Sequence, residues 1–337
     1  MTTQAGSSGG GRNPYRLGAR RGLAACASDR GTFVVLALDH RQNLRRELRP
    51  DAPDTVTYDE MVDFKRTVVR ALSTTATGTL LDPEIGAAQC IADGSLPARA
   101  GLIVAIEATG YLGPPTARVS RVLDGWSVDQ AKRMGASAAK LLVYYHPDAP
   151  NAADQERLVM EVADACVDAD LALFVEPLSF SVREGQRMTG EERRRVVVET
   201  ARRLTSIGGD VLKAEFPYDP SITDEGLWAA ACAELDGASS VPWVLLSGGV
   251  DDATFAAQVR VACAAGASGV LAGRSVWAEA ATMDPAARDA FLRSTARDRL
   301  RGLVELVEAT GRPWHDRPGP LALAPDPGEG WYLGDSG

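Results

Sequence analysis

Two lysines stand inside apolar stretches where a buried strand would ordinarily carry Val or Leu. Lys140 lies in the segment AKLLVY and Lys213 in the segment DVLKAEFP. Lysine is almost never fully buried unless a partner pairs with it or a reaction uses it. Its amine can condense with a ketone, and the iminium that forms draws electrons from a breaking carbon–carbon bond. The two lysines therefore point to imine chemistry, with purely structural pairing at the rim of a strand as the alternative interpretation.

Two carboxylates follow apolar runs in the same way. Glu176 ends the run LALFV, and Asp39 ends the run FVVLAL. Beside an imine-forming lysine, Glu176 would move protons, and Asp39 would bind hydroxyls or help to dehydrate the carbinolamine. Taken singly, Asp39 could instead cap the helix expected over 41–48, and Glu176 could anchor a loop before Pro177. Residue type alone leaves both interpretations open.

The elements that must position these residues repeat along the chain. Short apolar runs without alternation are typical of strands that are covered on both faces of a parallel sheet. Helix-like stretches separate them, including TGEERRRVVVETARRL with its capping-box pattern. The runs lie at 33–38, 78–81, 102–106, 139–144, 171–175, 210–214, 243–246 and 269–272. Eight such units predict a single-domain (β/α)8 TIM barrel over 16–312. An open doubly wound sheet is the alternative, although no G-x-G-x-x-G turn follows the first run.

A barrel would bring polar residues from nearly every strand to one rim, because active sites lie at the carboxyl ends of the strands. The residues at these ends are Asp39, His40, Arg41, Asp82, Glu84, Glu107, Lys140, Glu176, Lys213 and Glu215. The joint placement favours a catalytic role for Lys213, Glu176, Lys140 and Asp39 over four separate structural roles.

The last two strands carry a different signal. The segments LSGGVDD and LAGRSVW place glycines between a strand and a helix, where free backbone N–H groups commonly bind phosphate after strands seven and eight of a barrel. Arg274 adds a charge that can bind phosphate in a bidentate manner. The alternative is a pair of ordinary glycine turns. The predicted phosphate site consists of Ser247, Gly248, Gly249, Gly273 and Arg274.

The composition and net charge of the chain argue against several classes of function. A net charge of −9 gives no basic face for nucleic acid. The five cysteines and three histidines show no metal-ligand spacing, so neither a metal nor another cofactor is expected. The absence of an apolar run of about 18 residues argues against a membrane span. Residues 1–15 are expected to be a disordered Gly/Ser-rich leader without a signal peptide, 313–337 an irregular Pro/Gly-rich tail, and the protein cytoplasmic.

An ordered set of motifs over about 33–280 resembles the class I tagatose-1,6-bisphosphate aldolase family, which includes the sulfofructose-phosphate aldolases. The motifs are LALDHRQNLRREL, LLDPEIG, EATGY, DGWSVDQAKRMGASAAKLLVYYHPD, LFVEPLSF, VLKAEFP, LLSGGV and GVLAGRSVW. The resemblance implies a barrel lyase that cleaves a phosphorylated ketose to dihydroxyacetone phosphate and an aldehyde, and that forms a homo-oligomer. It also implies roles: Lys213 as the Schiff-base lysine, Glu176 as the proton mediator, Lys140 as a second pocket lysine and Asp39 as a pocket aspartate.

The sequence departs from the family pattern just after Asp39. It reads DHRQN, with His40 where Gln is common, and these residues border the sugar. His40 is expected to pack or bind a hydroxyl, or else to assist proton transfer. Arg41 and Arg45 are candidates for a phosphate or sulfonate at the far end of the substrate, although Arg45 is expected to face solvent. Two other functions stay open: a metal-dependent aldolase of the same fold, and a non-catalytic regulator that binds phosphosugars.

Overall fold

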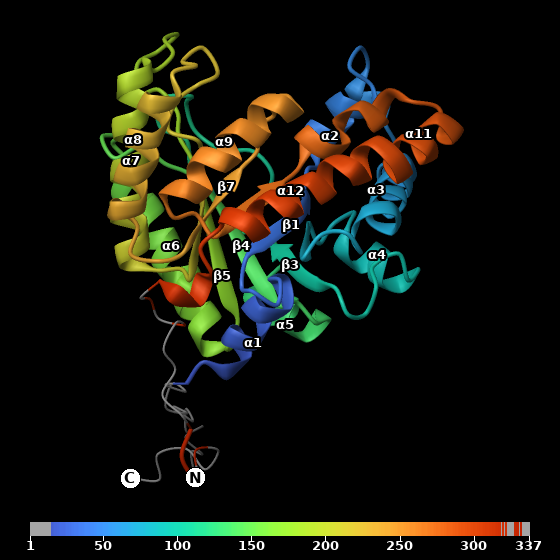
Figure 1. Ribbon diagram of the computed structural model, residues 1–337, viewed down its shortest axis with the longest axis horizontal. Helices are drawn as coiled ribbons and strands as arrows, with labels where there is room; N and C mark the ends of the chain where they lie inside the picture. The colour runs from blue at the N-terminus through green and yellow to red at the C-terminus, as the bar shows by residue number, and fades with distance from the viewer. Residues whose placement is uncertain (1–14, 318, 320, 322–326, 330, 332–337) are drawn as a thin grey trace, which may run out of the picture.

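Eight parallel strands close into a barrel in sequential order in the computed structural model, which describes residues 15–317, 319, 321, 327–329 and 331 (Figure 1). The predicted (β/α)8 fold is confirmed. Each predicted strand is present, and only the fifth differs by more than one residue at an end, because it continues through Glu176. The strands are β1 (Phe33–Leu38), β2 (Gly78–Leu81), β3 (Gly101–Ala105), β4 (Ala138–Tyr144), β5 (Ala172–Leu178), β6 (Val211–Ala214), β7 (Trp243–Leu246) and β8 (Gly269–Ala272).

Helices surround the barrel, and the longer ones pack in order around it, as Figure 1 shows for α7, α8, α9 and α12. The long helices are α3 (Tyr58–Leu72), α6 (Ala152–Asp168), α7 (Gly190–Ile207), α8 (Glu225–Ala238), α9 (Asp252–Ala265) and α12 (Arg297–Thr310). The shorter ones are α1 (Leu17–Cys26), α2 (Gln42–Leu48), α4 (Ala87–Ala92), α5 (Val128–Met134), α10 (Arg274–Trp277) and α11 (Pro285–Phe291). The described residues also form four short helical turns: η1 (Pro53–Thr55), η2 (Ala278–Thr282), η3 (Leu292–Ala296) and η4 (Trp314–Asp316).

Local sequence signals set the ends of the helices. The predicted capping box at the start of α7 is confirmed: the Thr189 side chain accepts from the Glu192 N–H, and the Glu192 side chain reaches back to Thr189. Helix α9 begins after Asp251, whose side chain accepts from Thr254 N, and it ends at Gly266 with a φ of 119°. Because only glycine adopts that conformation without strain, the chain can turn there into β8.

Helix α1 seals the end of the barrel where the strands begin, which is the lower end in Figure 1. Its Leu23 and Cys26 join Phe33 and Phe174 in the core inside the barrel. The approach is so close that a Cβ on Gly22 would lie 1.8 Å from the Ser137 carbonyl oxygen. Because this end is filled by apolar side chains, the polar cavity lies at the opposite end.

Both lysines point into the barrel at the upper edge of its apolar floor. On its strand, Lys140 stands two residues beyond Ala138 and Lys213 two residues beyond Val211, and both of these belong to the apolar core inside the barrel. Lys140 is fully buried and Lys213 is 4% exposed. The strand register therefore removes both amines from bulk water without placing them in the apolar core.

The chain beyond the barrel packs back on it where it is described. Trp314 is 4% exposed and joins the core inside the barrel, and Arg317 pairs with Asp236. Most of the predicted tail, and all but Tyr15 of the predicted leader, lie outside the described residues.

A buried ion pair ties β2 to α3. Lys65 and Asp82 are both fully buried, and the Lys65 ammonium donates to Asp82 Oδ1. The other oxygen, Asp82 Oδ2, accepts from the backbone N–H groups of Glu84 at 3.0 Å and Ile85 at 2.8 Å. Asp82 was expected at the rim of the cavity, but its carboxylate serves this structural pair instead.

Replacement of Lys65 by Met should therefore lower the free energy of unfolding by about 3–5 kcal/mol, because it leaves a buried carboxylate without a cation. Urea unfolding followed by far-ultraviolet circular dichroism measures the loss. The control is Arg301→Met, which breaks the exposed pair with Asp298 and should cost less than about 1 kcal/mol. Equal losses in the two variants would contradict a stabilising role for the buried pair.

Candidate active site

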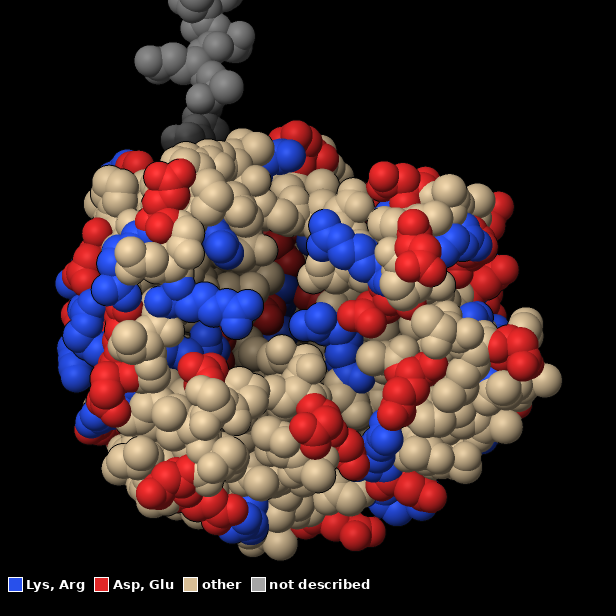
Figure 2. Space-filling view, turned by 90° about the horizontal axis from the view of Figure 1, so that it is seen from above, with Lys and Arg blue, Asp and Glu red and all other residues tan. Residues whose placement is uncertain are grey.

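A cavity of about 610 Å³ opens at the end of the barrel opposite α1. Figure 2 shows this face from above, with a central hollow and charged side chains of both signs at its edge. Most of the residues predicted from strand ends converge there, whereas Asp82 and Glu84 do not line the cavity. The lining includes Asp39, His40, Arg41, Glu107, Lys140, Glu176, Lys213, Glu215, Ser247, Gly248, Gly273 and Arg274.

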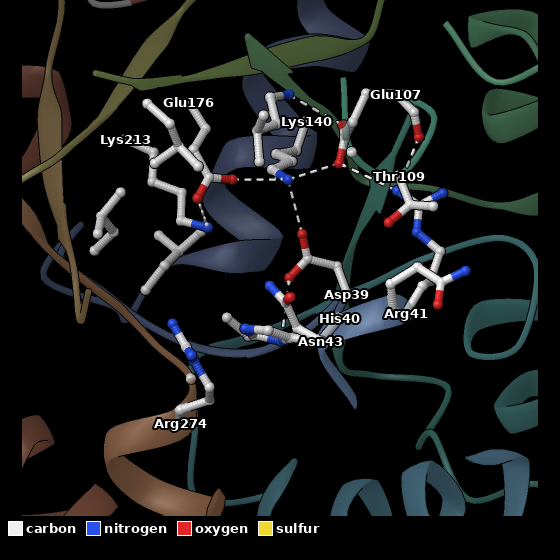
Figure 3. Close-up of a pocket in the computed structure, with 18 of the residues that line it drawn as sticks. Asp39, His40, Arg41, Asn43, Glu107, Thr109, Lys140, Glu176, Lys213 and Arg274 are labelled. Carbon is white, nitrogen blue, oxygen red and sulfur yellow. Dashed lines mark hydrogen bonds and ion pairs between the residues drawn. The ribbon is translucent and has the colours of Figure 1, made fainter. Parts of the chain in front are cut away.

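Three carboxylates surround the Lys140 amine. Its Nζ lies 2.7 Å from Asp39 Oδ2, 2.8 Å from Glu107 Oε1 and 2.7 Å from Glu176 Oε2 (Figure 3). The carboxylates come from the ends of β1 and β3 and from β5, so three strands meet at an amine supplied by β4. Glu107 is held further by the Leu142 N–H, which donates to its Oε2 at 3.1 Å.

The charges in this cluster stabilise one another. Burial opposes ionisation of Lys140, but the Asp39, Glu107 and Glu176 carboxylates outweigh it and hold the Lys140 pKa well above its ordinary value. Burial likewise opposes ionisation of Asp39, and the Lys140 and Lys213 charges hold the Asp39 pKa well below its ordinary value. Lys140 is therefore a fixed ammonium ion, and Asp39 a fixed carboxylate.

Glu176 bridges the two lysines. While Oε2 faces Lys140, Oε1 lies 2.8 Å from Lys213 Nζ (Figure 3). The register of β5 and β6 pairs Phe174 with Val211 and Val175 with Leu212, so the next position along both strands brings Glu176 beside Lys213. Among the described residues, Lys213 thus has one carboxylate partner where Lys140 has three. A carboxylate at hydrogen-bond distance can accept a proton from the Lys213 ammonium and leave a nucleophilic amine.

Arg41 forms the wall of the cavity on the β3 side. Its guanidinium donates to Glu84 Oε2 at 2.6 Å and to the Glu107 carbonyl oxygen at 2.9 Å, and it is 9% exposed. Because these contacts engage both Nη atoms, Arg41 holds Glu107 in place as well as lining the cavity.

His40 packs at the side of the cavity near β8. Its ring meets the edge of Trp277 with centroids 5.2 Å apart, and Nδ1 is buried 3.9 Å from Asp39 Oδ1. Burial, with the charges of Arg274, Lys213 and Lys65, lowers the His40 pKa to about 4 against the opposing effect of Asp39. His40 is therefore a neutral imidazole near pH 7. This supports the expected packed or hydroxyl-binding role more than proton transfer.

The predicted phosphate residues gather on the β7–β8 side. Ser247, Gly248, Gly273 and Arg274 line the cavity, whereas Gly249 lies behind Arg274. Gly249 has a φ of 80°, and a Cβ there would lie 2.9 Å from Arg274 Nη2. Glycine at this position allows the guanidinium to lie against the turn. Among the described residues, Arg274 makes one ion-pair contact, at 3.4 Å to Glu47.

Arg45, a sequence candidate for the far end of the substrate that was expected to face solvent, is half-buried, donates to the Val56 carbonyl and does not line the cavity.

Some lining residues were not predicted from the sequence. Arg46 lines the cavity and contacts Asn43 at 3.0 Å. Tyr144 also lines the cavity, on the inward face of β4 beyond Lys140. The inward period of two along β4 was a signal that would have identified Tyr144.

In the part of the chain that the structure describes, no group of three or more His, Cys, Asp or Glu side chains is arranged to hold a metal ion. No helix there is long and apolar enough to span a membrane.

Comparisons with known proteins agree with this geometry. Residues 33–279 match the model of the DeoC/LacD family aldolases. The chain is 30% identical over 324 residues to the tagatose 1,6-diphosphate aldolase of Lactococcus lactis subsp. lactis, covering 88% of this chain and 98% of that protein. It is 29% identical over 322 residues to tagatose 1,6-diphosphate aldolase 2 of Streptococcus agalactiae serotype III, with the same coverage of each.

Solved structures support the fold. The fructose-bisphosphate aldolase of Plasmodium falciparum superposes with a TM-score of 0.69 at 12% identity, covering 88% of this chain and 96% of that one. A Schiff-base-forming fructose-1,6-bisphosphate aldolase superposes with a TM-score of 0.57 at 21% identity, covering 86% and 99%. By the family match and the full-length relatives together, the chain belongs to the DeoC/LacD family of aldolases.

Proposed function

We propose that the protein is a class I aldolase that cleaves a phosphorylated ketose through a Schiff base on Lys213. The observation that carries the proposal is the bridge of Glu176 between Lys213 and Lys140 in the cavity. The tagatose 1,6-diphosphate aldolases among its relatives support a ketose bisphosphate or a close analogue, such as a 6-sulfonated fructose 1-phosphate, as substrate.

The environments of the two lysines support Lys213 as the nucleophile. Lys140 stays protonated among three carboxylates, and an ammonium ion has no lone pair for attack on a carbonyl. Lys213 faces the same cavity with a single carboxylate that can take its proton. Lys140 therefore supplies a fixed positive charge, and Lys213 supplies the nucleophile.

The proposed reaction uses Lys213 as the nucleophile and Lys140 as a fixed positive charge. Glu176 accepts a proton from Lys213, and the amine attacks the C2 carbonyl of the open-chain ketose. Glu176 returns that proton to the carbinolamine hydroxyl, and water leaves to give the iminium, while the Asp39 carboxylate accepts a hydrogen bond from the departing group. Glu176, or a group that it orients, then removes the C4 hydroxyl proton, and the C3–C4 bond breaks with its electrons moving to the iminium. The aldehyde leaves, C3 of the enamine is protonated, and hydrolysis releases dihydroxyacetone phosphate and free Lys213.

The 1-phosphate is assigned to the β7–β8 side. Arg274, Ser247 and the backbone of Gly248 and Gly273 offer charge and hydrogen-bond donors there, adjacent to Lys213 on β6. The far end of the substrate then points toward Arg41 and Arg46. We also propose, on family resemblance, that residues 16–312 are the catalytic domain and that the enzyme is a cytoplasmic homo-oligomer.

Borohydride reduction in the presence of dihydroxyacetone phosphate should trap an adduct on Lys213. Peptide mass spectrometry locates the adduct, and Lys213→Met should abolish both the adduct and cleavage. Lys140→Met is the matched control: it should slow cleavage but leave any trapped adduct on Lys213. An adduct on Lys140, or active turnover with no adduct anywhere, would overturn the assignment.

The phosphate assignment predicts an effect that depends on the 1-phosphate. Arg274→Met should lower kcat/KM for a ketose 1-phosphate by about 10- to 100-fold, the usual range for losing charge-assisted hydrogen bonds. It should have much less effect on the same ketose without the phosphate. Steady-state cleavage assays with the two substrates measure the difference.

Gly249→Ala should reproduce the effect of Arg274→Met, because its new methyl group displaces the guanidinium. The control is Gly237→Ala in α8, where a Cβ meets nothing within 4 Å. If Arg274→Met impairs both substrates equally, Arg274 does not bind the 1-phosphate.

A further inference from the structure

A second cavity lies beside the active one on the same face of the protein. It has a volume of about 610 Å³ and is formed by the loops that follow β3, β5 and β6. Four arginines line it against a single acidic residue, Asp219; they are Arg118, Arg183, Arg187 and Arg193. Figure 2 shows Lys and Arg side chains gathered beside the central hollow, on the side where α7 and α8 lie. Such a concentration of one charge is unexpected in a protein with a net charge of −9.

Two of these arginines are already neutralised. Arg183 pairs with Glu192, and Arg193 donates to Glu215 Oε1 at 2.9 Å. Within the part of the chain that the structure describes, neither Arg118 nor Arg187 has a carboxylate within ion-pair distance. The cavity therefore holds two guanidinium groups that make no ion pair with a described side chain, and the one nearby carboxylate in its lining, Asp219, interacts with Arg187 only at longer range.

Aromatic rings and one hydrogen bond hold the Arg118 guanidinium in place. Its guanidinium lies over the rings of Tyr111, Tyr144 and Phe180, at 4.6, 5.3 and 5.2 Å from their centroids. Nε donates to the Pro115 carbonyl at 3.1 Å, whereas the Nη atoms donate to no acceptor among the described residues. Stacking fixes the plane of the group and leaves its outer edge, the part that binds phosphate in a bidentate manner, without a partner.

The two cavities share a wall. Tyr111 and Tyr144, over which Arg118 stacks, line the active cavity, and so does Glu215, the partner of Arg193. Arg41, Arg46 and Arg274 lie elsewhere in the active cavity and do not line the second one. The second cavity is therefore adjacent to the substrate region but separate from the phosphate residues assigned above.

We propose that this second cavity binds a multiply anionic small molecule of the phosphate-ester or pyrophosphate class through Arg118 and Arg187. Its volume lies in the usual range for small-molecule sites, about 300–1,000 Å³, and its concave shape favours such a ligand over a protein or nucleic acid partner. The unpaired guanidinium groups supply the attraction, and the fixed plane of Arg118 reduces the entropy lost on binding.

Calorimetric titration with pyrophosphate tests the site on the full chain at low ionic strength. Wild-type protein should bind two equivalents, one at Arg274 and one in the second cavity, and Arg274→Met should bind one. In the Arg274→Met background, Arg187→Met or Arg118→Met should weaken the remaining site by about tenfold each. The control is Arg195→Met. Arg195 lies on α7 outside this cavity and pairs with Asp148, so its replacement should leave the affinity of the remaining site unchanged.

Two results would overturn the proposal: no binding to the Arg274→Met protein, or a remaining site that Arg187→Met does not weaken. Arg187 is exposed and makes no ion pair with described residues, so its replacement keeps the test valid if Arg118→Met fails to fold. The titration does not require catalysis. Failure to trap an adduct on Lys213 would therefore not bear on this site. Likewise, failure to detect pyrophosphate in the second cavity would not bear on the Schiff base at Lys213.

Discussion

The contact on which the active site depends is the buried Lys140 ammonium held by three carboxylates. Asp39, Glu107 and Glu176 would repel one another strongly at this burial without a cation between them, and the cation would be equally costly without them. Each member is therefore fixed by the others. The consequence reaches Lys213, because the Glu176 carboxylate that faces Lys140 with Oε2 also faces Lys213 with Oε1.

Such a cluster needs a scaffold that brings distant segments to one level, and a closed parallel barrel provides it. Asp39 and Lys213 are far apart in the chain, yet each follows or occupies a strand whose carboxyl end faces the same cavity. The register fixes the height: one residue of slippage in β4 would turn Lys140 toward the outer helices. Helix α1 closes the other end, so the apolar floor stays dry and the charges above it act in a low dielectric.

The sequence predicted this framework well because its signals are local. Apolar runs without alternation placed the strands, and the Thr189–Glu192 pair placed the start of α7. What it could not supply was the partner of each charge, which depends on register across strands. Glu107 was recognised only as a strand end, and Asp82 was expected at the rim although it binds Lys65. The choice of Lys213 as nucleophile rested on the family resemblance, and the number of carboxylates around each amine adds a physical argument for that proposal.

The same physics separates the parts of the cavity that are constrained from those that can vary. The Asp39, Glu107 and Glu176 carboxylates share the Lys140 ammonium, so replacing Lys140 would leave three buried carboxylates without their common cation. The β1–α2 segment differs: Gln42, Asn43 and Arg46 are exposed, and the only side-chain contact described among them joins Asn43 to Arg46. On the proposed function, substitution there would change the charge that meets the far end of a substrate without removing a member of the Lys140 cluster. His40, where the sequence departs from the family pattern, lies closer to that cluster, with its Nδ1 3.9 Å from Asp39 Oδ1. Its replacement would therefore change the surroundings of Asp39 as well as the surface that meets the sugar.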